Sequence, residues 1–137
     1  MKKSWTDKFN AKSNFEIKVL EKAFWGHEVG DKMLIPSPAI IQDYINEHDA
    51  GIRLELNTMR DDLALTYGAD FTCPLTTGIF LRIVAEMNHE QYAEGASLES
   101  ICPFWRIIEP QSKLAGKLSF GTELIRKMRH QENIDLK

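Results

Sequence analysis

The sequence has few of the features that mark a membrane, a metal site or a disulfide framework. Its only cysteines, Cys73 and Cys102, lack the paired spacing of a zinc knuckle or a redox pair, so we expect two free, buried thiols. The four histidines are scattered and share no ligand spacing. No apolar run follows the first lysines, and no window approaches the roughly 18 apolar residues that span a bilayer. We therefore predict a cytoplasmic protein with no membrane contact, no metal and no cofactor.

Positive charge is also scarce. The 137 residues carry 17 basic and 20 acidic side chains, a net charge of −3, and composition alone gives no electrostatic case for nucleic acid. The basic surplus lies at the front, where residues 1–36 hold seven lysines and five acids, whereas residues 51–137 hold ten basic and twelve acidic side chains. Any DNA site must therefore be a local patch.

What is present is an ordinary globular composition, 43% hydrophobic, in a length typical of one domain. Residues 1–35 are predicted to be an N-terminal extension packed on the domain, with a short strand at 15–20 and a helical turn at 21–25. Ser37 is a good N-cap and Pro38 suits the first helical position, so a helix should follow and end near Gly51. Its apolar face would comprise Ile40, Ile41, Tyr44 and Ile45.

The centre of the chain predicts a helix-turn-helix pattern. Residues 52–56 alternate as a short strand or an extended entry, after which Asn57 can cap a helix over 57–67 that stops at Gly68. A tight link then leads to a second helix over 75–87. The polar stretch 88–100 is predicted to be partly helical at best.

The C-terminal part predicts a wing and a closing helix. Residues 104–118 have the composition of a β hairpin, and a last helix should start at Thr122 or Gly121 and end near Gln131. The predicted fold is thus α+β and mainly helical, with a winged helix-turn-helix and a small β hairpin in residues 36–137.

This order of elements resembles the DNA-binding domain of the alkylguanine-DNA alkyltransferases, across roughly residues 34–133. Leu63-Ala64 matches the Ile-Ala that ends the family's first helix, and the segment from Leu75 to Gly78 matches its Arg-x-Val-Gly. The family's active-site motif Pro-Cys-His-Arg-Val corresponds to the segment from Pro103 to Ile107, Pro-Phe-Trp-Arg-Ile. The closing helix of the family corresponds to Gly121, Glu123 and Glu132.

The departures from the family pattern concern its chemistry. Phe104 replaces the nucleophilic cysteine and Trp105 replaces the histidine that activates it, and neither side chain can do that work. Cys102 lies on the wrong side of Pro103. The family's finger arginine aligns with Leu75 and its tyrosine with Arg60, and the segment between Gly78 and Pro103 is about a dozen residues longer than the resemblance implies. We therefore predict no catalytic residue and no alkyl transfer.

The candidate binding residues each have a structural alternative. The resemblance implies DNA contacts through Arg60, Thr76, Thr77, Gly78, Arg82 and Arg106, and a base pocket formed by Leu75, Pro103, Phe104 and Trp105. Phe104 and Trp105 could stack an extruded base or pack in the core, and Arg106 could hold a phosphate or orient the fold by bonding carbonyls and carboxylates. Thr76 and Thr77 could meet phosphate or cap a helix that packs closely at Gly78.

Charged side chains elsewhere also allow two readings. Arg82, Arg126, Lys127 and Arg129 could contact a DNA backbone, but acidic neighbours favour a solvated face. Lys2, Lys3, Lys8 and Lys12 could form a basic arm, although ordinary termini also look like this.

Two functional hypotheses follow. The first is a non-enzymatic, alkyltransferase-like protein that binds double-stranded DNA, recognises alkylated guanine and presents it to a repair protein. The second is a winged-helix module that has lost DNA binding and contacts a protein. A contiguous positive face across Arg82, Arg106 and the closing helix would support the first, and an acidic or apolar face would support the second.

Overall fold

The computed structural model describes residues 4–11 and 14–134. Its first half contains α1 (Trp5–Ala11), β1 (Glu16–Val19), β2 (Lys32–Ile35), α2 (Pro38–Asn46), α3 (Leu56–Tyr67) and β3 (Phe71–Thr72). Its second half contains α4 (Pro74–Ala93), the 3-10 turn η1 (Phe104–Arg106), α5 (Lys113–Lys117) and α6 (Glu123–Gln131). The described residues thus form an α+β fold that is about half helical, with a small three-stranded sheet. None of their helices is both long and apolar enough to cross a bilayer.

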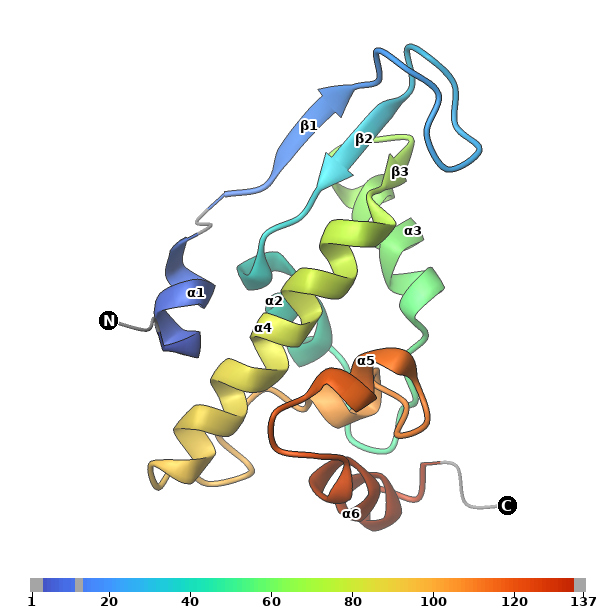
Figure 1. Cartoon of the computed structure of the whole chain (residues 1–137). Helices are drawn as coiled ribbons and strands as arrows, with labels where there is room; N and C mark the ends of the chain where they lie inside the picture. Colours follow the sequence, from blue (N-terminus) through green and yellow to red (C-terminus); the bar gives the residue numbers. More distant parts are fainter. Residues whose placement is uncertain (1–3, 12–13, 135–137) are drawn as a thin grey trace.

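The sheet joins the N-terminal extension to the rest of the chain. β1 pairs with β2 in an antiparallel hairpin, and β2 pairs in parallel with β3, which lies in the link between α3 and α4. The strand predicted at 15–20 is confirmed as β1. The helical turn predicted at 21–25 is wrong, because Phe24 and His27 instead form a bridge around a turn. The hairpin projects from one end of the molecule (Figure 1).

Local signals correctly located α2 and the end of α3. The Ser37 side chain accepts a hydrogen bond from the Ile40 N–H, and Pro38 occupies the first turn, as predicted. Gly68 ends α3 in the left-handed conformation with φ +76°. The cap predicted at Asn57 is wrong, because α3 starts one residue earlier and Glu55 occupies the N-cap position without a side-chain hydrogen bond. The stretch before it is the extended entry, where the Leu54 N–H donates to the Arg106 carbonyl.

Helix α4 is the central element and is longer than predicted. It continues to Ala93, and two of the polar residues in this extension, Asn88 and Glu90, have hydrogen-bond partners on other segments. Asn88 donates to Gln42 of α2 and accepts from the Cys102 N–H, and the Glu90 carboxylate accepts the Trp5 and Thr6 N–H groups of α1. α1 and α2 therefore both pack along α4 (Figure 1).

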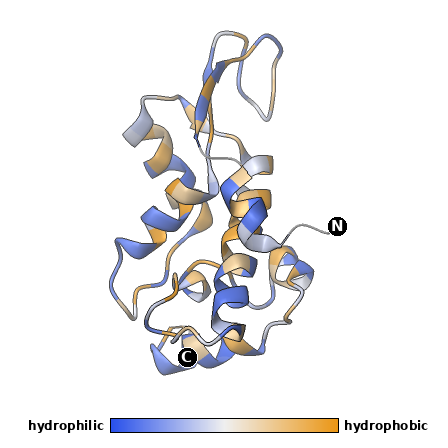
Figure 2. Cartoon of the chain, turned by 90° about the vertical axis from the view of Figure 1, so that its left-hand side faces the viewer, coloured by the Kyte–Doolittle hydropathy of each residue, from blue (hydrophilic) through white to orange (hydrophobic). Residues whose placement is uncertain are grey.

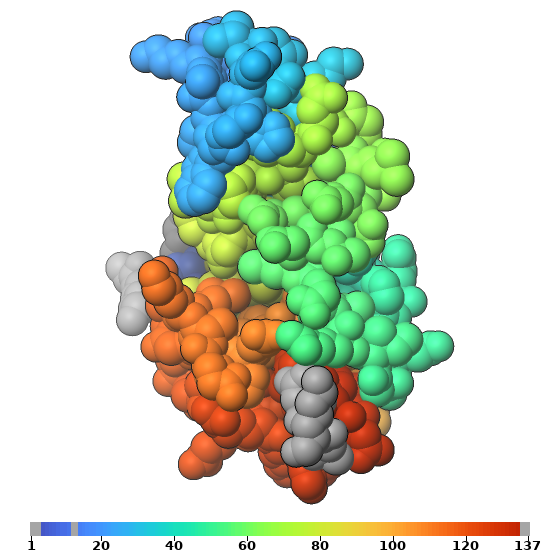
Figure 3. Space-filling model, turned by 90° about the vertical axis from the view of Figure 1, so that its right-hand side faces the viewer, coloured from blue at the N-terminus to red at the C-terminus, as the bar shows by residue number. Residues whose placement is uncertain are grey.

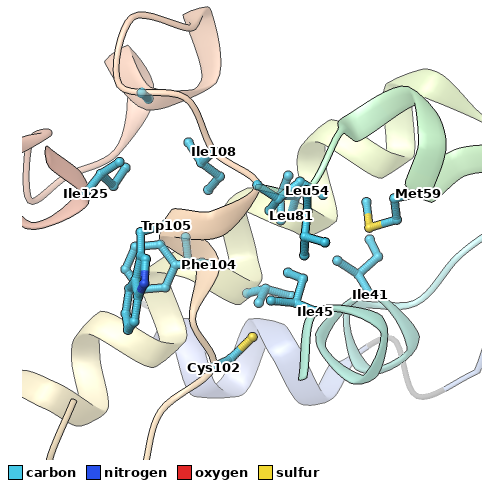
Figure 4. Packing of buried hydrophobic residues seen from close by; sticks show 14 of the residues in the cluster. Ile41, Ile45, Leu54, Met59, Leu81, Cys102, Phe104, Trp105, Ile108 and Ile125 are labelled. Carbon is cyan, nitrogen blue, oxygen red and sulfur yellow. The ribbon is translucent and has the colours of Figure 1, made fainter. Parts of the chain in front are cut away.

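The predicted hairpin over residues 104–118 is wrong. Phe104 to Arg106 form the 3-10 turn η1, and Ser112 caps α5 by accepting from the Ala115 N–H. Phe104 is fully buried and Ile108 nearly so, and Figure 4 places both among core side chains of α2, α3 and α4. The apolar run that looked like a strand is therefore a core-filling turn.

The closing helix is confirmed. α6 follows Gly121 with Thr122 at the N-cap position, although the Thr122 side chain makes no capping hydrogen bond. In Figure 3 the hairpin, α3 and the C-terminal helices follow one another along the molecule, from blue through green to orange and red.

Two glycines allow a test of this backbone. At both Gly68 and Gly78 an added methyl group would meet no heavy atom of the described residues within 4 Å, so only conformation differs. Gly68→Ala should lower the free energy of unfolding by about 1 kcal/mol, because an alanine resists the left-handed region. Gly78→Ala should raise it by about 0.5–1 kcal/mol, because alanine favours the helix. Urea denaturation measures both, and effects of the same sign would contradict these backbone assignments.

Candidate functional site

A groove runs along the N-terminal half of α4, between α1 and α5. We call it the α4 groove, and its lining residues are Trp5, Lys8, Pro74, Leu75, Gly78, Ile79, Arg82, Ile83, Leu114 and Lys117. Its floor is apolar, with Leu75 and Ile79 53% and 58% exposed. Its volume is about 660 Å³. Three cations and no carboxylate are among the described residues that line it, so it is a local positive patch on a chain of negative net charge.

The cations of the α4 groove are organised around one indole ring. Lys8 Nζ lies 4.2 Å and Arg82 Cζ 5.2 Å from the centre of the Trp5 ring, within the range of cation–π attraction. Arg82 Nε also lies 3.5 Å from the carboxylate of buried Glu86, which accepts hydrogen bonds from the Ser119 N–H and hydroxyl. Arg82 is thus fixed in place while its side chain stays 36% exposed.

The predicted residues at the start of α4 divide into two groups. Leu75, Gly78 and Arg82 line the α4 groove. Thr77 is fully buried and its hydroxyl donates to the Cys73 carbonyl, so it cannot reach a phosphate. The Thr76 hydroxyl is also buried, without a hydrogen-bond partner among the described residues. Close packing at Gly78, the expected alternative, is wrong because open space surrounds that position.

Arg60 lies in a different, smaller hollow. This hollow measures about 270 Å³ and is also lined by Trp25, Asp61 and Asp70. The Arg60 guanidinium donates a hydrogen bond to the side chain of Asn57. Two carboxylates beside one arginine make this hollow less suitable for a phosphate than the α4 groove.

Arg106 and Trp105 line a third cavity, which we call the Glu132 cavity. It measures about 530 Å³ and is lined by Asn46, Ala50, Leu98, Glu99, Ser100, Ile101, Pro103, Trp105, Arg106, Met128, Gln131 and Glu132. Arg106 donates to the Glu132 carboxylate at 2.8 Å and to the His48 carbonyl at 2.8 Å. Trp105 Nε1 donates to the same carboxylate at 2.7 Å. The structural alternative for Arg106, bonding to carbonyls and carboxylates, is what the geometry supports.

Glu132 is held ionised by these donors. Burial by itself would raise its pKa, but hydrogen bonds from Arg106, the Gly51 N–H and Trp105 outweigh that effect and hold the pKa below its ordinary value. Its carboxylate is therefore a fixed anion that joins η1, the segment from His48 to Gly51, and the end of α6.

The predicted base pocket does not form as one site. Phe104 is fully buried and contacts the Phe120 and Trp105 rings, and Trp105 is 2% exposed, so neither ring face is open to a stacked base. Pro103 and Trp105 line the Glu132 cavity, whereas Leu75 lines the α4 groove. Of the two alternatives for Phe104 and Trp105, stacking of an extruded base is therefore not supported, and packing in the core is what their burial shows.

The remaining candidates also separate. Arg129 is buried and donates to the carbonyls of Trp105 and Ile108, while Arg126 and Lys127 are exposed on α6. The contiguous basic face across Arg82, Arg106 and the closing helix that would have favoured DNA binding is therefore not formed by these residues. Of the proposed basic arm, Lys8 lines the α4 groove; Lys2, Lys3 and Lys12 lie outside the described residues.

Both cysteines are buried. Burial raises the pKa of the Cys102 thiol to about 12, so almost no thiolate exists at neutral pH.

Several residues on these surfaces were not predicted from the sequence. The α4 groove is completed by Trp5, Pro74, Ile79, Ile83, Leu114 and Lys117, and Ile79 could have been found because it lies one turn from Leu75 on the predicted helix. Trp25 is 61% exposed in a turn with φ +51°, a conformation that no local pattern indicated.

Comparisons with protein-family models, with curated proteins and with solved structures give no match for this chain.

The Glu132 network can be tested by its contribution to stability. Glu132→Gln removes the charge that compensates Arg106 in a largely buried pair, and should lower the free energy of unfolding at neutral pH by about 3 kcal/mol. A carboxylate with a lowered folded pKa stabilises above its unfolded pKa, and this stability is lost as the pH falls through the folded value. The difference between the two proteins should therefore shrink below roughly pH 4.

Urea denaturation across this pH range measures the difference. Glu123→Gln, an exposed carboxylate on the same helix, is the matched control and should change stability by less than about 0.5 kcal/mol. An equal loss in both variants would show that the network does not stabilise the fold.

Proposed function

We propose that this chain is a non-enzymatic, alkyltransferase-like protein that binds double-stranded DNA with the exposed face of α4. The observation that carries the proposal is the α4 groove, where Lys8, Arg82 and Lys117 surround exposed residues at the start of one helix. Cations next to a helix face suit a duplex, because phosphates bind the charges while the helix enters the major groove.

The arrangement of α3 and α4 supports this proposal. α3 covers the range predicted for the first helix, α4 contains and extends the range predicted for the second, and the link from Gly68 to Cys73 joins them. In a helix-turn-helix the second helix is the recognition helix, and this is the role we propose for α4. The proposed motif has no wing at residues 104–118, where the chain forms η1 and α5 instead. Exposed Leu75 and Ile79 are apolar and would meet thymine methyl groups rather than hydrogen-bonding edges.

The residues of the Pro-x-x-Arg segment support a non-enzymatic role. Phe104 fills the core at the family's nucleophile position, and Trp105, at the family's histidine position, donates its only N–H to Glu132. These contacts engage both side chains in the fold, which supports a segment without a nucleophile and its activating base. They also lend no support to stacking of an extruded alkylguanine between these rings.

The proposal predicts a characteristic salt dependence. Since Lys8 and Lys117 line the groove and Arg82 is also paired with Glu86, two to three phosphate contacts are expected, and log Kd should change with log salt concentration with a slope of roughly 2 to 3. Lys117→Ala should weaken binding to all duplexes alike and reduce that slope by about one. Fluorescence titration of a labelled duplex, with and without one alkylated guanine, at several salt concentrations measures both quantities.

The matched control is Lys127→Ala, which removes another exposed lysine, on α6 and outside the α4 groove. It should leave affinity and slope nearly unchanged. Equal losses in the two lysine variants would mean that binding is not located on α4.

A second candidate function is favoured by the same exposed apolar residues. Leu75 and Ile79 could receive the apolar face of an amphipathic helix whose acidic residues pair with Lys8 and Lys117. Absence of saturable binding to either duplex at low salt would leave this protein-contact function as the better account of the α4 groove.

Absence of alkyl transfer is a separate prediction. Incubation with DNA carrying a labelled methyl group on guanine should leave the protein unlabelled, because Cys102 and Cys73 are buried and the Cys102 thiol stays protonated. Scintillation counting of the isolated protein measures this. Labelling that is lost in Cys102→Ser would place the chain among the enzymes.

A further inference from the structure

Strand β1 has an outer edge that no described strand covers. The sheet order is β1-β2-β3, so β1 pairs with β2 on one side only. On β2, the carbonyls of Lys32 and Leu34 accept from the Asp70 and Cys73 N–H groups and so face β3. Main-chain groups alternate in direction along a strand. Met33 and Ile35 of β2, which lie opposite Lys18 and Glu16, therefore direct their main-chain groups at β1.

The same alternation fixes the direction of the backbone of β1. Glu16 and Lys18 direct their N–H and C=O groups at β2, which leaves the main-chain groups of Ile17 and Val19 directed outward. The side chains of Ile17 and Val19 are also partly open, with Val19 59% exposed. The outer edge thus offers both hydrogen-bonding groups and apolar surface.

The sequence of this edge is complementary to itself. In an antiparallel pairing of two copies with a two-fold axis at Ile17, the two Ile17 residues lie opposite each other. Glu16 then lies opposite the second copy's Lys18, and Phe15 lies opposite its Val19. Opposite charges and aromatic–β-branched neighbours are the cross-strand pairs that stabilise sheets. A lysine in mid-strand normally guards an edge against pairing, but in this register it has a carboxylate opposite it.

The pairing also satisfies backbone geometry. The outward N–H and C=O of Ile17 would bond to those of its copy, and this is the pair type in which the Cα atoms lie about 5.5 Å apart. Glu16 and Lys18 would then fall in the closer, non-hydrogen-bonded pairs, where their side chains meet most easily. The hairpin projects past the helices at one end of the molecule in two views (Figures 1 and 2), although β2 contacts α3 at the base of the hairpin.

We infer that β1 is a dimerisation edge, and that two copies of this chain join their sheets through antiparallel β1 strands centred on Ile17. The contact is isologous, since the same strand serves both copies, and it needs no other partner. It does not depend on the proposed function, because the outer edge of β1 is formed by residues that do not line the α4 groove.

Charge exchange tests the register directly. The full chain should form a concentration-dependent dimer in sedimentation equilibrium. In Lys18→Glu, Glu16 of each copy lies opposite a glutamate at position 18 of the other copy. The two pairs of like charges should raise the dimer Kd by roughly tenfold or more. The double variant Glu16→Lys/Lys18→Glu restores opposite pairs and should return the Kd to within about threefold of the original. Because Glu16 also takes part in an interaction within its own chain, circular dichroism of each variant checks that the fold is intact.

A disulfide trap tests the two-fold position. In a dimer of Ile17→Cys, the cysteines at position 17 of the two copies would have Cα atoms about 5.5 Å apart, a separation at which a disulfide can form. Mild oxidation should therefore cross-link Ile17→Cys into a covalent dimer. Val29→Cys, at a residue 65% exposed outside β1, is the control and should cross-link far less.

Rescue by the double variant together with selective cross-linking at residue 17 would support the inference. A monomer at every concentration, a dimer unaffected by Lys18→Glu, or equal cross-linking at residues 17 and 29 would each overturn it.

Discussion

The carboxylate of Glu132 joins three segments that lie far apart in the sequence, and the C-terminal half of the molecule depends on this contact. It accepts from the Gly51 N–H before α3, from Trp105 and Arg106 in η1, and it stands at the end of α6. Since an ion pair that is mostly removed from water is costly to break, these segments are fixed relative to one another. Arg106 and Trp105 thereby serve the fold, which leaves them unable to act as a phosphate clamp or an open stacking platform.

Helix α4 shows which parts of this fold could be read from the sequence. Several signals that act within a few residues were correct: Ser37 and Pro38 start α2, and Gly68 ends α3. Others were wrong, as for the cap at Asn57 and the helical turn at 21–25. Structure that depends on distant partners was harder to predict. The polar stretch 88–100 was correctly expected to be partly helical, but the end of its helical part could not be located, because Asn88 and Glu90 are held in α4 by hydrogen bonds with Gln42, Cys102 and α1. The apolar segment at 104–108 suggested a strand, because strand composition and a buried turn look alike when the surrounding core is unknown.

The candidate site was predicted in parts. Leu75, Gly78 and Arg82 share a helix face, so spacing alone could group them, and the structure places them in one groove. Lys8 and Lys117 join that groove from α1 and α5, which no periodicity connects to α4. Phe104 and Arg106 were assigned to binding through the resemblance, whereas burial and the Glu132 contact determine what they do here. A motif transfers the identity of residues more safely than it transfers their exposure.

The low charge of this chain has a consequence for how it would bind DNA. Non-specific affinity comes almost entirely from phosphate contacts, and the α4 groove offers three cations on a molecule of net charge −3. A long-range positive field would be weak, so association with arbitrary duplexes would be both slow and short-lived. A larger share of the affinity would then fall to short-range contacts made by exposed Leu75 and Ile79. Apolar contacts of that kind distinguish thymine from other bases by its methyl group. The same apolar side chains could also bind the apolar face of a protein helix. The balance between three cations and two exposed aliphatic side chains, rather than the order of α3 and α4, would therefore decide which of the two proposed partners the α4 groove prefers.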